Sequence, residues 1–246
     1  RAGPRARMEI RGERECTACG TRWSYYETGN VHCPACGNLR SVAAEDERRE
    51  HTDGVATIVL DDAIAAAGRD DYRAAAREAR DVVRDYTHER GFVRGGDLRE
   101  LDDTVLAAWE LRYVAAAFAR SFDHSEAEAY YFVSLLRGAP AGERPDASDV
   151  PDSMRAARGN GYADAVGDYR ADVRRFLDTG PERPAANDLL ASLDDHVRRI
   201  HALDGDVSPA TADRLVAAAR ATGRYARDGD EADEAAAREA IDHLTE

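Results

Sequence analysis

All four cysteines of this chain lie in one short block near its start. Cys16 and Cys19 form a first Cys-x-x-Cys pair, and Cys33 and Cys36 form a second pair after thirteen intervening residues. Each pair aims two sulfur atoms at one point, and the residues between the pairs suffice for a hairpin that brings them together. The block therefore predicts a tetrahedral site for one Zn²⁺ per chain, held by these four thiolates in a zinc ribbon.

Iron is the alternative metal, because four thiolates also suit iron. Cys-x-x-Cys-Gly, followed by aromatic residues and then by Cys-Pro-x-Cys, resembles the rubredoxin-like modules of rubrerythrins. That resemblance implies a di-iron helical bundle with paired Glu-x-x-His motifs. The sequence contains no such pair, and its nearest approach is a single Asp85-x-x-His88. We therefore predict zinc and keep iron as the minor alternative, with His32 as a surface residue beside a complete ligand shell.

The ribbon is predicted to span residues 8–42. Residues 9–11 and the aromatic-rich residues 22–26 favour extended strands, and Thr28, Gly29 and Asn30 favour a turn. Residues 1–7 differ in composition and are interpreted as a disordered leader. Residues 43–56 are rich in charge and are interpreted as a solvated linker.

Helical periodicity dominates residues 57–246, which we predict to form one helical domain. The fold class is therefore mainly α, with a small N-terminal β ribbon followed by an antiparallel bundle of six to eight helices. A flexible loop is expected at residues 138–150, where proline and glycine are frequent, and Pro151 is expected to begin a short helix. The other predicted helices are 71–90, 97–120, 125–136, 162–177, 184–203, 208–223 and 230–244, of which the second and third begin with capping-box patterns at Asp97 and Ser125.

The charge of the chain is distributed unevenly. Residues 8–42 carry four arginines and four glutamates, whereas the whole chain has a formal net charge of −14. A neutral region on a strongly acidic protein is where we expect a partner, either a protein or a nucleic acid strand. The predicted contact residues are Arg22, Trp23, Tyr25, Tyr26 and Arg40. The alternative interpretation is that Trp23 and Tyr25 form the small core of the ribbon.

Composition indicates the setting in which the protein works. All 34 basic residues are arginine, against 48 acidic residues. Such a surface is typical of proteins in concentrated salt, where the Debye length falls to about 3 Å at 1 M. No signal peptide or membrane-spanning run is recognisable, and no cysteine remains for disulfides. These features favour a cytoplasmic protein of a halophile that makes no membrane contact.

No catalytic residues are predicted. A P-loop is impossible without lysine, and the sequence contains neither a dinucleotide-binding glycine motif nor a nucleophile elbow nor a His-Glu-x-x-His zinc motif. The protein is therefore more consistent with a binding role than with an enzyme, although an enzyme site within the helical domain stays open as an alternative.

The segment from Arg11 to Gly37, with its Cys16-Thr-Ala-Cys19-Gly and Cys33-Pro-Ala-Cys36-Gly repeats, is similar to the start of a group of haloarchaeal zinc-ribbon-containing proteins. Their ribbon is likened to that of transcription factor B, which contacts RNA polymerase. The resemblance implies the role of zinc ligand for the four cysteines. We hypothesise an adaptor or regulatory protein whose ribbon contacts a protein or nucleic acid, with the helical bundle as a second interaction or homo-oligomerisation surface; a rubredoxin-like redox protein is the alternative.

Overall fold

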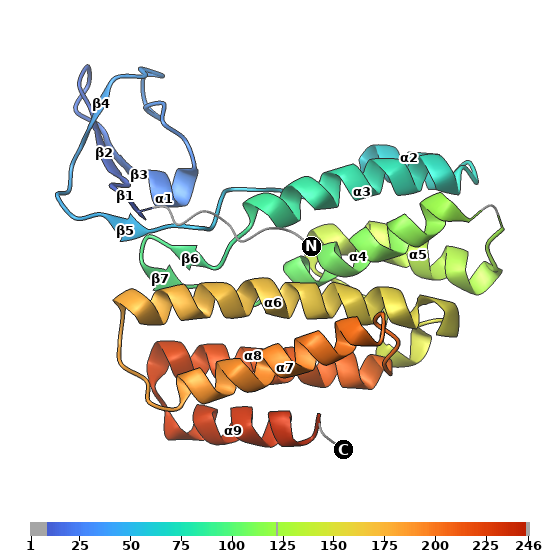
Figure 1. The fold of residues 1–246 in the computed structure, drawn as a ribbon. Coiled ribbons are helices and arrows are strands. Elements are labelled where there is room, and N and C mark those ends of the chain that lie inside the picture. Colours follow the sequence, from blue (N-terminus) through green and yellow to red (C-terminus); the bar gives the residue numbers. More distant parts are fainter. Residues whose placement is uncertain (1–8, 122, 245–246) are drawn as a thin grey trace.

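The computed structural model describes residues 9–121 and 123–244 (Figure 1). It confirms the predicted fold class, because a small β region at the N-terminus is followed by a mainly helical domain. The leader expected at residues 1–7 lies outside the described residues.

The ribbon is built on a three-stranded antiparallel sheet. The central strand β2 (Glu13–Cys16) pairs with β3 (Arg22–Ser24) on one side and with β4 (Ser41–Ala43) on the other. The strand expected over residues 22–26 ends at Ser24, because the next residues form a single helical turn, α1 (Tyr25–Thr28). Gly29 ends this turn with a positive φ of 61°, which glycine tolerates better than other residues.

The prediction that residues 43–56 form a solvated linker is partly wrong. A short strand, β5 (Arg49–Glu50), pairs with β1 (Glu9–Ile10), and the four consecutive residues from Glu50 to Asp53 are buried. The chain then continues as an extended segment whose backbone amides at Thr52 and Asp53 donate to the carbonyl oxygen of Val93. The connection between ribbon and bundle is thus packed into the protein.

Ion pairs around the buried Asp53 hold this connection. We call Asp53, with Arg90, Arg94 and Asp102, the junction. Asp53 is fully buried and accepts hydrogen bonds from Arg90 at the end of α3 (Tyr72–Glu89) and from Arg94, whose Nη2 lies 2.6 Å from Oδ2 of Asp53. Arg90 also reaches Oδ2 of Asp102 at 2.8 Å, and these two carboxylates raise the pKa of Arg90 despite its burial. One guanidinium group therefore links the connection to two helices.

A second buried carboxylate binds the same segment from the other side. Oδ2 of Asp172, on α6 (Arg155–Thr179), accepts a 2.7 Å hydrogen bond from the Thr52 hydroxyl and a 2.8 Å bond from the Phe92 amide. Arg175 neutralises Asp172 at 2.7 Å. Because residues 52 and 53 are held from several elements, the ribbon has a fixed place on the bundle.

A β-hairpin stands where the sequence predicted the start of a helix. Strands β6 (Val93–Arg94) and β7 (Asp97–Leu98) pair across Gly95 and Gly96, whose φ values are 60° and 91°. Two consecutive positive φ angles suit the tight turn of a two-residue hairpin. The expected capping box at Asp97 is therefore wrong, and α4 (Asp103–Arg120) begins six residues later with Asp102 as its N-cap.

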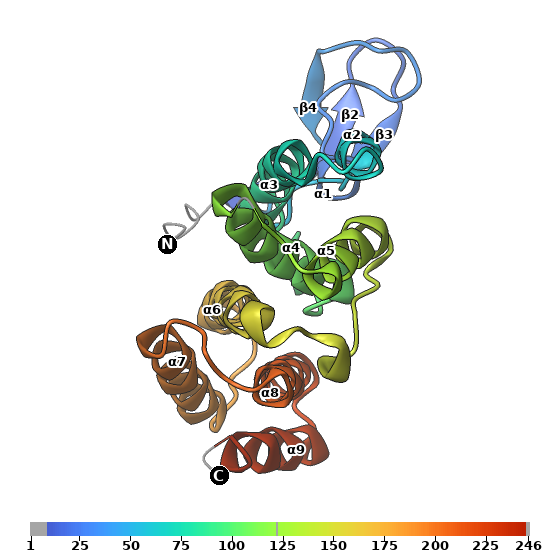
Figure 2. The ribbon, with the colours of Figure 1, turned by 90° about the vertical axis from the view of Figure 1, so that its right-hand side faces the viewer.

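The helices form two groups with α6 between them (Figure 2). On one side α6 packs against α4, and on the other against α7 (Ala186–Ala202) and α8 (Pro209–Asp228). The remaining helices are α2 (Asp61–Ala67), α5 (Glu126–Gly138) and α9 (Glu231–Asp242). The capping box predicted at Ser125 is confirmed.

Several helix boundaries differ from the prediction. Helix α6 begins at Arg155, directly after the 3-10 turn Asp152–Met154, instead of near residue 162. Helix α8 continues through Gly223 to Asp228. The segment expected to be a flexible loop, residues 138–150, contains the 3-10 turns Ala139–Ala141 and Ala147–Asp149.

Close helix contacts depend on small residues. A Cβ at Gly161 of α6 would lie 2.9 Å from the Trp109 carbonyl oxygen of α4, and a Cβ at Gly223 of α8 would overlap the hydroxyl of Tyr169. Both glycines therefore sit inside helices because the neighbouring element leaves no room for a side chain. Tertiary packing overrides the helix-ending tendency of Gly223.

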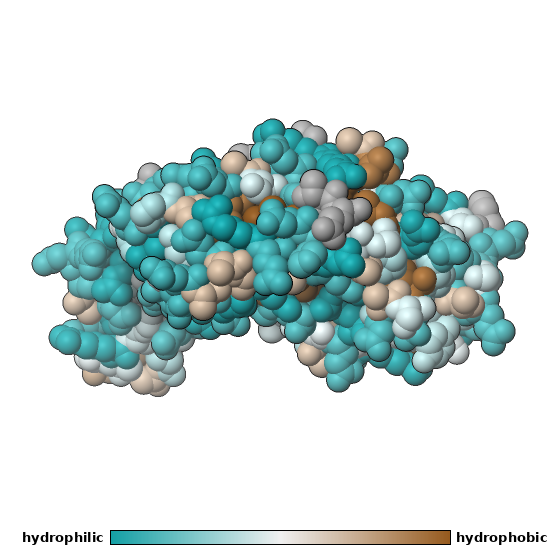
Figure 3. All heavy atoms as spheres, turned by 90° about the horizontal axis from the view of Figure 1, so that it is seen from below, coloured by the Kyte–Doolittle hydropathy of each residue, from teal (hydrophilic) through white to brown (hydrophobic). Residues whose placement is uncertain are grey.

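Two further properties concern the helices and the molecular surface. Within residues 9–121 and 123–244, no helix has the length and apolar content needed to cross a membrane. The face on the side of α9 is coloured mostly hydrophilic, with small and scattered hydrophobic areas (Figure 3).

Replacing Gly161 with alanine tests the α4 and α6 contact. Because the new methyl group would meet backbone atoms of Trp109 and Glu110, we expect a loss of about 1–3 kcal/mol in the free energy of unfolding, measured by chemical denaturation. Gly167→Ala on the same helix is the control, since its Cβ would meet only Val197 at 3.9 Å. That variant should be neutral or up to about 1 kcal/mol more stable; equal effects at both positions would contradict the packing argument.

Removing the carboxylate of Asp53 tests the junction. Asp53→Ala leaves Arg90 and Arg94 without their shared buried partner, so we expect a loss of about 3 kcal/mol in the free energy of unfolding. Asp46→Ala, at an exposed position seven residues earlier, should change stability by less than about 0.5 kcal/mol. Hydrogen exchange should also show faster exchange at the Thr52 and Asp53 amides; unchanged protection there would refute the role of the junction.

Candidate metal centre

The two Cys-x-x-Cys turns have the same backbone geometry. In the first turn the Cys16 amide donates to Thr21 O at 2.9 Å and the Gly20 amide donates to Cys16 O at 3.0 Å. In the second turn Cys33 and Gly37 make the corresponding bonds at 3.0 and 2.8 Å. Gly20 and Gly37 have φ values of 69° and 71°, a conformation that glycine adopts readily. Each turn therefore presents its pair of sulfur atoms in the same way.

The four sulfur atoms converge on one point. Sγ of Cys16 lies 3.6 Å from Sγ of Cys36, and Sγ of Cys19 lies 3.6 Å from Sγ of Cys33. All four lie within 4.8 Å of one another and none is in a disulfide. Tetrahedral coordination with metal–sulfur bonds of about 2.3 Å requires sulfur separations of about 3.8 Å. The arrangement thus fits one four-coordinate metal ion.

The pKa values of the thiols reflect the close approach of the four sulfur atoms. A hydrogen bond with the Thr21 hydroxyl, 3.2 Å away, lowers the pKa of Cys19 to about 6. The Asn38 amide favours the thiolate of Cys36, but the neighbouring sulfurs of Cys19 and Cys16 outweigh it and raise the pKa of Cys36 to about 12. Four thiolates at this spacing repel one another, and their charge is compensated when a divalent ion binds them.

Trp23 belongs to the core of the ribbon. Its side chain is buried together with Cys16 and Cys33, and its indole Nε1 donates to the Asn30 carbonyl oxygen at 2.9 Å. This hydrogen bond attaches the loop that carries the second cysteine pair to β3. Trp23 therefore supports the metal ligands, in agreement with the core interpretation of this residue.

Tyr26 is also buried, and it attaches the ribbon to the bundle. Its hydroxyl lies 2.6 Å from the Ile10 carbonyl oxygen and 3.0 Å from Oε1 of Glu45. Its ring lies 5.4 Å from that of His51, and a Cβ at Gly95 would be 3.0 Å from it. Burial and its short contacts exclude Tyr26 from the predicted partner surface, as they do Trp23.

The remaining predicted contact residues differ in exposure. Arg22 and Arg40 are exposed, whereas Tyr25 is half-buried with its ring 6.0 Å from that of His51. The strand register places Arg22, Glu15 and Val42 opposite one another on β3, β2 and β4, on the side of the sheet away from Trp23. We call this side, with the adjoining residues Leu39 and Arg40, the ribbon outer face. It includes two exposed aliphatic side chains, Leu39 at 64% and Val42 at 53% exposure.

The bundle contains a polar cluster that the sequence did not reveal. Glu110 of α4 is fully buried, and it accepts hydrogen bonds from the hydroxyls of Tyr131 and Tyr162 and from Arg158 at 3.3 Å. Burial raises the pKa of Glu110. The bundle core is therefore not wholly apolar. Among the described residues, however, the four cysteines are the only group of three or more His, Cys, Asp or Glu residues placed to hold a metal.

Substituting a cysteine tests the metal centre. Cys33→Ser removes one of four ligands, so we expect loss of the bound metal measured by inductively coupled plasma mass spectrometry. Because the ribbon is too small to bury a core of its own, its amides should also exchange quickly with solvent, while those of α6 stay protected. His32→Ala is the control, since His32 is exposed and hydrogen-bonds Asn30. Full metal content in Cys33→Ser would contradict the four-sulfur site.

Comparison with known proteins assigns the chain to a family but not to a function. One family model matches residues 8–241, a range that includes both the ribbon and the helical domain. No match was found among curated proteins or among solved structures. The chain belongs to the family described as "Family of unknown function (DUF7117)".

Proposed function

We propose that this protein is a zinc-binding adaptor whose ribbon outer face contacts a protein partner, with the helical bundle as a second interaction surface. The observation that carries the proposal is the ribbon outer face itself, which combines two exposed aliphatic side chains, Leu39 and Val42, with the exposed arginines Arg22 and Arg40. Exposed aliphatic side chains flanked by arginine are common at protein interfaces. The junction supports this role because it holds the outer face in a fixed orientation on the bundle.

Zinc is the metal that we assign to the centre. All four donors are thiolates at a tetrahedral spacing, with no position left for a substrate or water, which is typical of a structural zinc site. Metal analysis of the purified protein should give one zinc per chain. Iron, accompanied by visible thiolate charge-transfer absorption, would instead support the rubredoxin-like alternative.

A protein partner is favoured over nucleic acid by the positions of the aromatic residues. Single-stranded nucleic acids bind by stacking bases on exposed aromatic rings. Trp23 and Tyr26 are buried and Tyr25 packs against His51, so the ribbon offers few rings for stacking. Its exposed side chains include the aliphatic Leu39 and Val42, the arginines Arg22 and Arg40, and one imidazole ring, that of His32.

The setting that we propose is a halophilic cytoplasm. The formal charge of −14 and the use of arginine alone as the cation fit a protein that works in concentrated salt. Binding that depends on aliphatic contacts persists at high salt, where long-range attraction between charges is screened. Binding experiments are therefore designed for molar potassium chloride.

The ribbon outer face is tested by a double substitution, Leu39→Ser with Val42→Ser. Affinity purification of the full chain from a native-type lysate in molar potassium chloride, followed by mass spectrometry, should recover a partner with wild type and lose it with this variant. The matched control is Tyr130→Ser, which removes a 75% exposed side chain from α5 of the bundle. The control should retain the partner, and zinc content should be unchanged in both variants.

Two outcomes would refute the proposal. Recovery of the same partner with the double variant would exclude the ribbon outer face as the contact surface. Loss of all bound material after nuclease treatment would show that the partner is a nucleic acid.

A further inference from the structure

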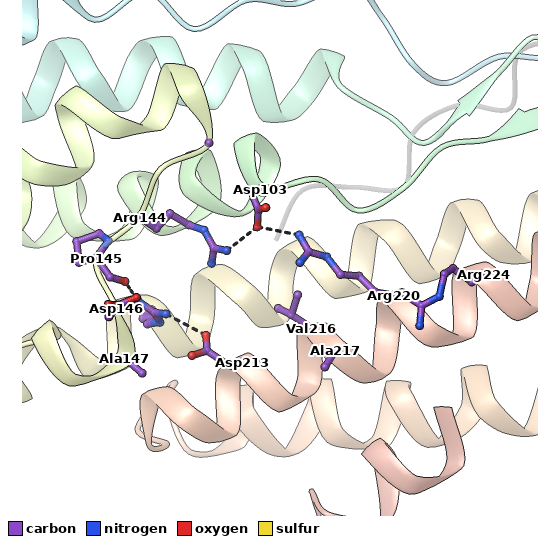
Figure 4. A pocket seen from close by; sticks show the side chains of 12 residues that line it. Asp103, Arg144, Pro145, Asp146, Ala147, Asp213, Val216, Ala217, Arg220 and Arg224 are labelled. Atoms are coloured by element: carbon purple, nitrogen blue, oxygen red, sulfur yellow. Dashed lines mark hydrogen bonds and ion pairs between the residues drawn. The ribbon is translucent and has the colours of Figure 1, made fainter. Parts of the chain in front are cut away.

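A cavity of about 560 Å³ lies between the loop after α5 and the helix α8. Figure 4 shows Arg144 and Asp103 on one side of it, and Asp213, Val216, Arg220 and Arg224 of α8 on the other. Its volume is in the usual range for small-molecule sites, about 300–1,000 Å³. The cavity is remote in sequence from the ribbon, and the adaptor role gives it no function.

The cavity concentrates positive charge in an acidic protein. Four arginines line it, Arg144, Arg158, Arg220 and Arg224, together with three aspartates, whereas the whole chain has a net charge of −14. The arginines come from the loop, from α6 and from two positions one turn apart on α8. Guanidinium groups gathered from separate elements are typical of sites for oxyanions.

The contacts of Asp103 show which kind of group these arginines bind. A single oxygen of Asp103, Oδ1, lies 2.6 Å from Nη2 of Arg144 and 2.8 Å from Nη2 of Arg220 (Figure 4). Both guanidinium groups lower the pKa of Asp103. Asp103 is itself half-exposed, with 53% of its side chain accessible. An oxyanion is thus held at the edge of the cavity by two arginines.

Several donors of the arginines that line the cavity have no acceptor. The Nε atoms of Arg144 and Arg158 are shielded from solvent and donate to no atom of the described residues. Within the same residues, Nη1 of Arg220 and both Nη atoms of Arg224 also lack hydrogen-bond acceptors, although Arg224 donates to Asp233 through Nε at 2.8 Å. Three aspartates therefore do not satisfy the four guanidinium groups.

The buried cluster around Glu110 fixes two of these arginines. Glu110 pairs with Arg158, and Tyr162 donates to Glu110 at 3.0 Å while accepting a hydrogen bond from Arg144. Arg158 lies over the ring of Tyr162, with its Cζ 4.9 Å from the ring centroid. The carbonyl oxygen of Leu101 holds Arg220 at 2.8 Å. Three arginines are thereby oriented before any ligand arrives, which lowers the entropic cost of binding.

We propose that this cavity binds a small molecule that carries a phosphate group. A phosphate offers three oxygens and up to two negative charges, so it satisfies more guanidinium donors than a carboxylate does. Its oxygens would take the free donors of Arg220 and Arg224 and compete with Asp103 for the donors that this residue occupies. Pro145, Ala147, Val216 and Ala217 line the rest of the cavity and would contact the less polar part of the ligand.

Isothermal titration calorimetry with inorganic pyrophosphate tests the proposal. The zinc-loaded full chain, at constant ionic strength, should bind one pyrophosphate per chain. The double variant Arg220→Gln with Arg224→Gln loses two charged donors, so its affinity should fall at least tenfold. The matched control, Arg198→Gln with Arg238→Gln, removes two exposed arginines of α7 and α9 that lie outside the cavity. Its affinity should equal that of wild type.

The variant Asp103→Asn distinguishes a binding site from an ion network that only stabilises the fold, because only a binding site predicts tighter pyrophosphate binding. Removing the competing negative charge should strengthen pyrophosphate binding several-fold, because Arg144 and Arg220 are released from it. Circular dichroism verifies folding of each variant, and if the double variant does not fold, Arg224→Gln alone should weaken binding about threefold. The proposal is overturned if wild type shows no saturable binding at millimolar pyrophosphate, if the arginine variants bind as wild type does, or if Asp103→Asn binds more weakly.

Discussion

The placement of the ribbon on the bundle depends on a buried carboxylate, Asp53. A fully buried charge is tolerated only when partners compensate the lost hydration, and Asp53 has Arg90 and Arg94 as partners. Arg90 in turn binds Asp102, the N-cap of α4. The segment that joins the two parts of the protein is therefore tied to the end of α3, to the hairpin β6–β7 and to the start of α4. Displacing the ribbon would separate these charges in a medium of low dielectric constant, so the junction favours one orientation.

The metal centre and the junction have separate roles. A metal ion bound by the four sulfurs would hold a ribbon that has few buried residues of its own, and Trp23 supports that arrangement from within. The junction, with Tyr26 and His51, then determines where the folded ribbon stands. A ribbon mounted in this way keeps its outer face at a fixed position relative to the bundle. Such rigidity would lower the entropic cost of binding the proposed partner.

Arginine is the only cationic side chain that the protein uses, and its geometry suits the buried positions. The planar guanidinium group donates in several directions, so Arg90 bridges two carboxylates and Arg158 contacts Glu110, Asp213 and the Pro145 carbonyl oxygen. A lysine ammonium could not satisfy the same acceptors with comparable directionality. Buried pairs are also screened less by salt than surface pairs. The several N–H donors of each guanidinium group stabilise the interior, and they also leave the cavity beside α8 rich in oriented donors.

The sequence by itself determined the cysteine cluster, the small N-terminal β region and most of the helices, because these depend on local spacing. Two Cys-x-x-Cys turns bring four sulfur atoms together from nearby residues, and apolar periodicity indicates which side of a helix is buried. Asp97 matches the local capping-box pattern of a helix start. The turn at Gly95 and Gly96 and the pairing of β6 with β7 nevertheless place this residue in a hairpin. The sequence places Asp213, Val216, Arg220 and Arg224 at helical spacing along one side of α8. That pattern alone does not predict the cavity, because Arg144 and Asp103 on its other side come from distant segments. Only the tertiary structure decided the partners of Asp53, Glu110 and Asp103, since the charge that compensates a buried group comes from whichever segment the fold brings within a few ångströms.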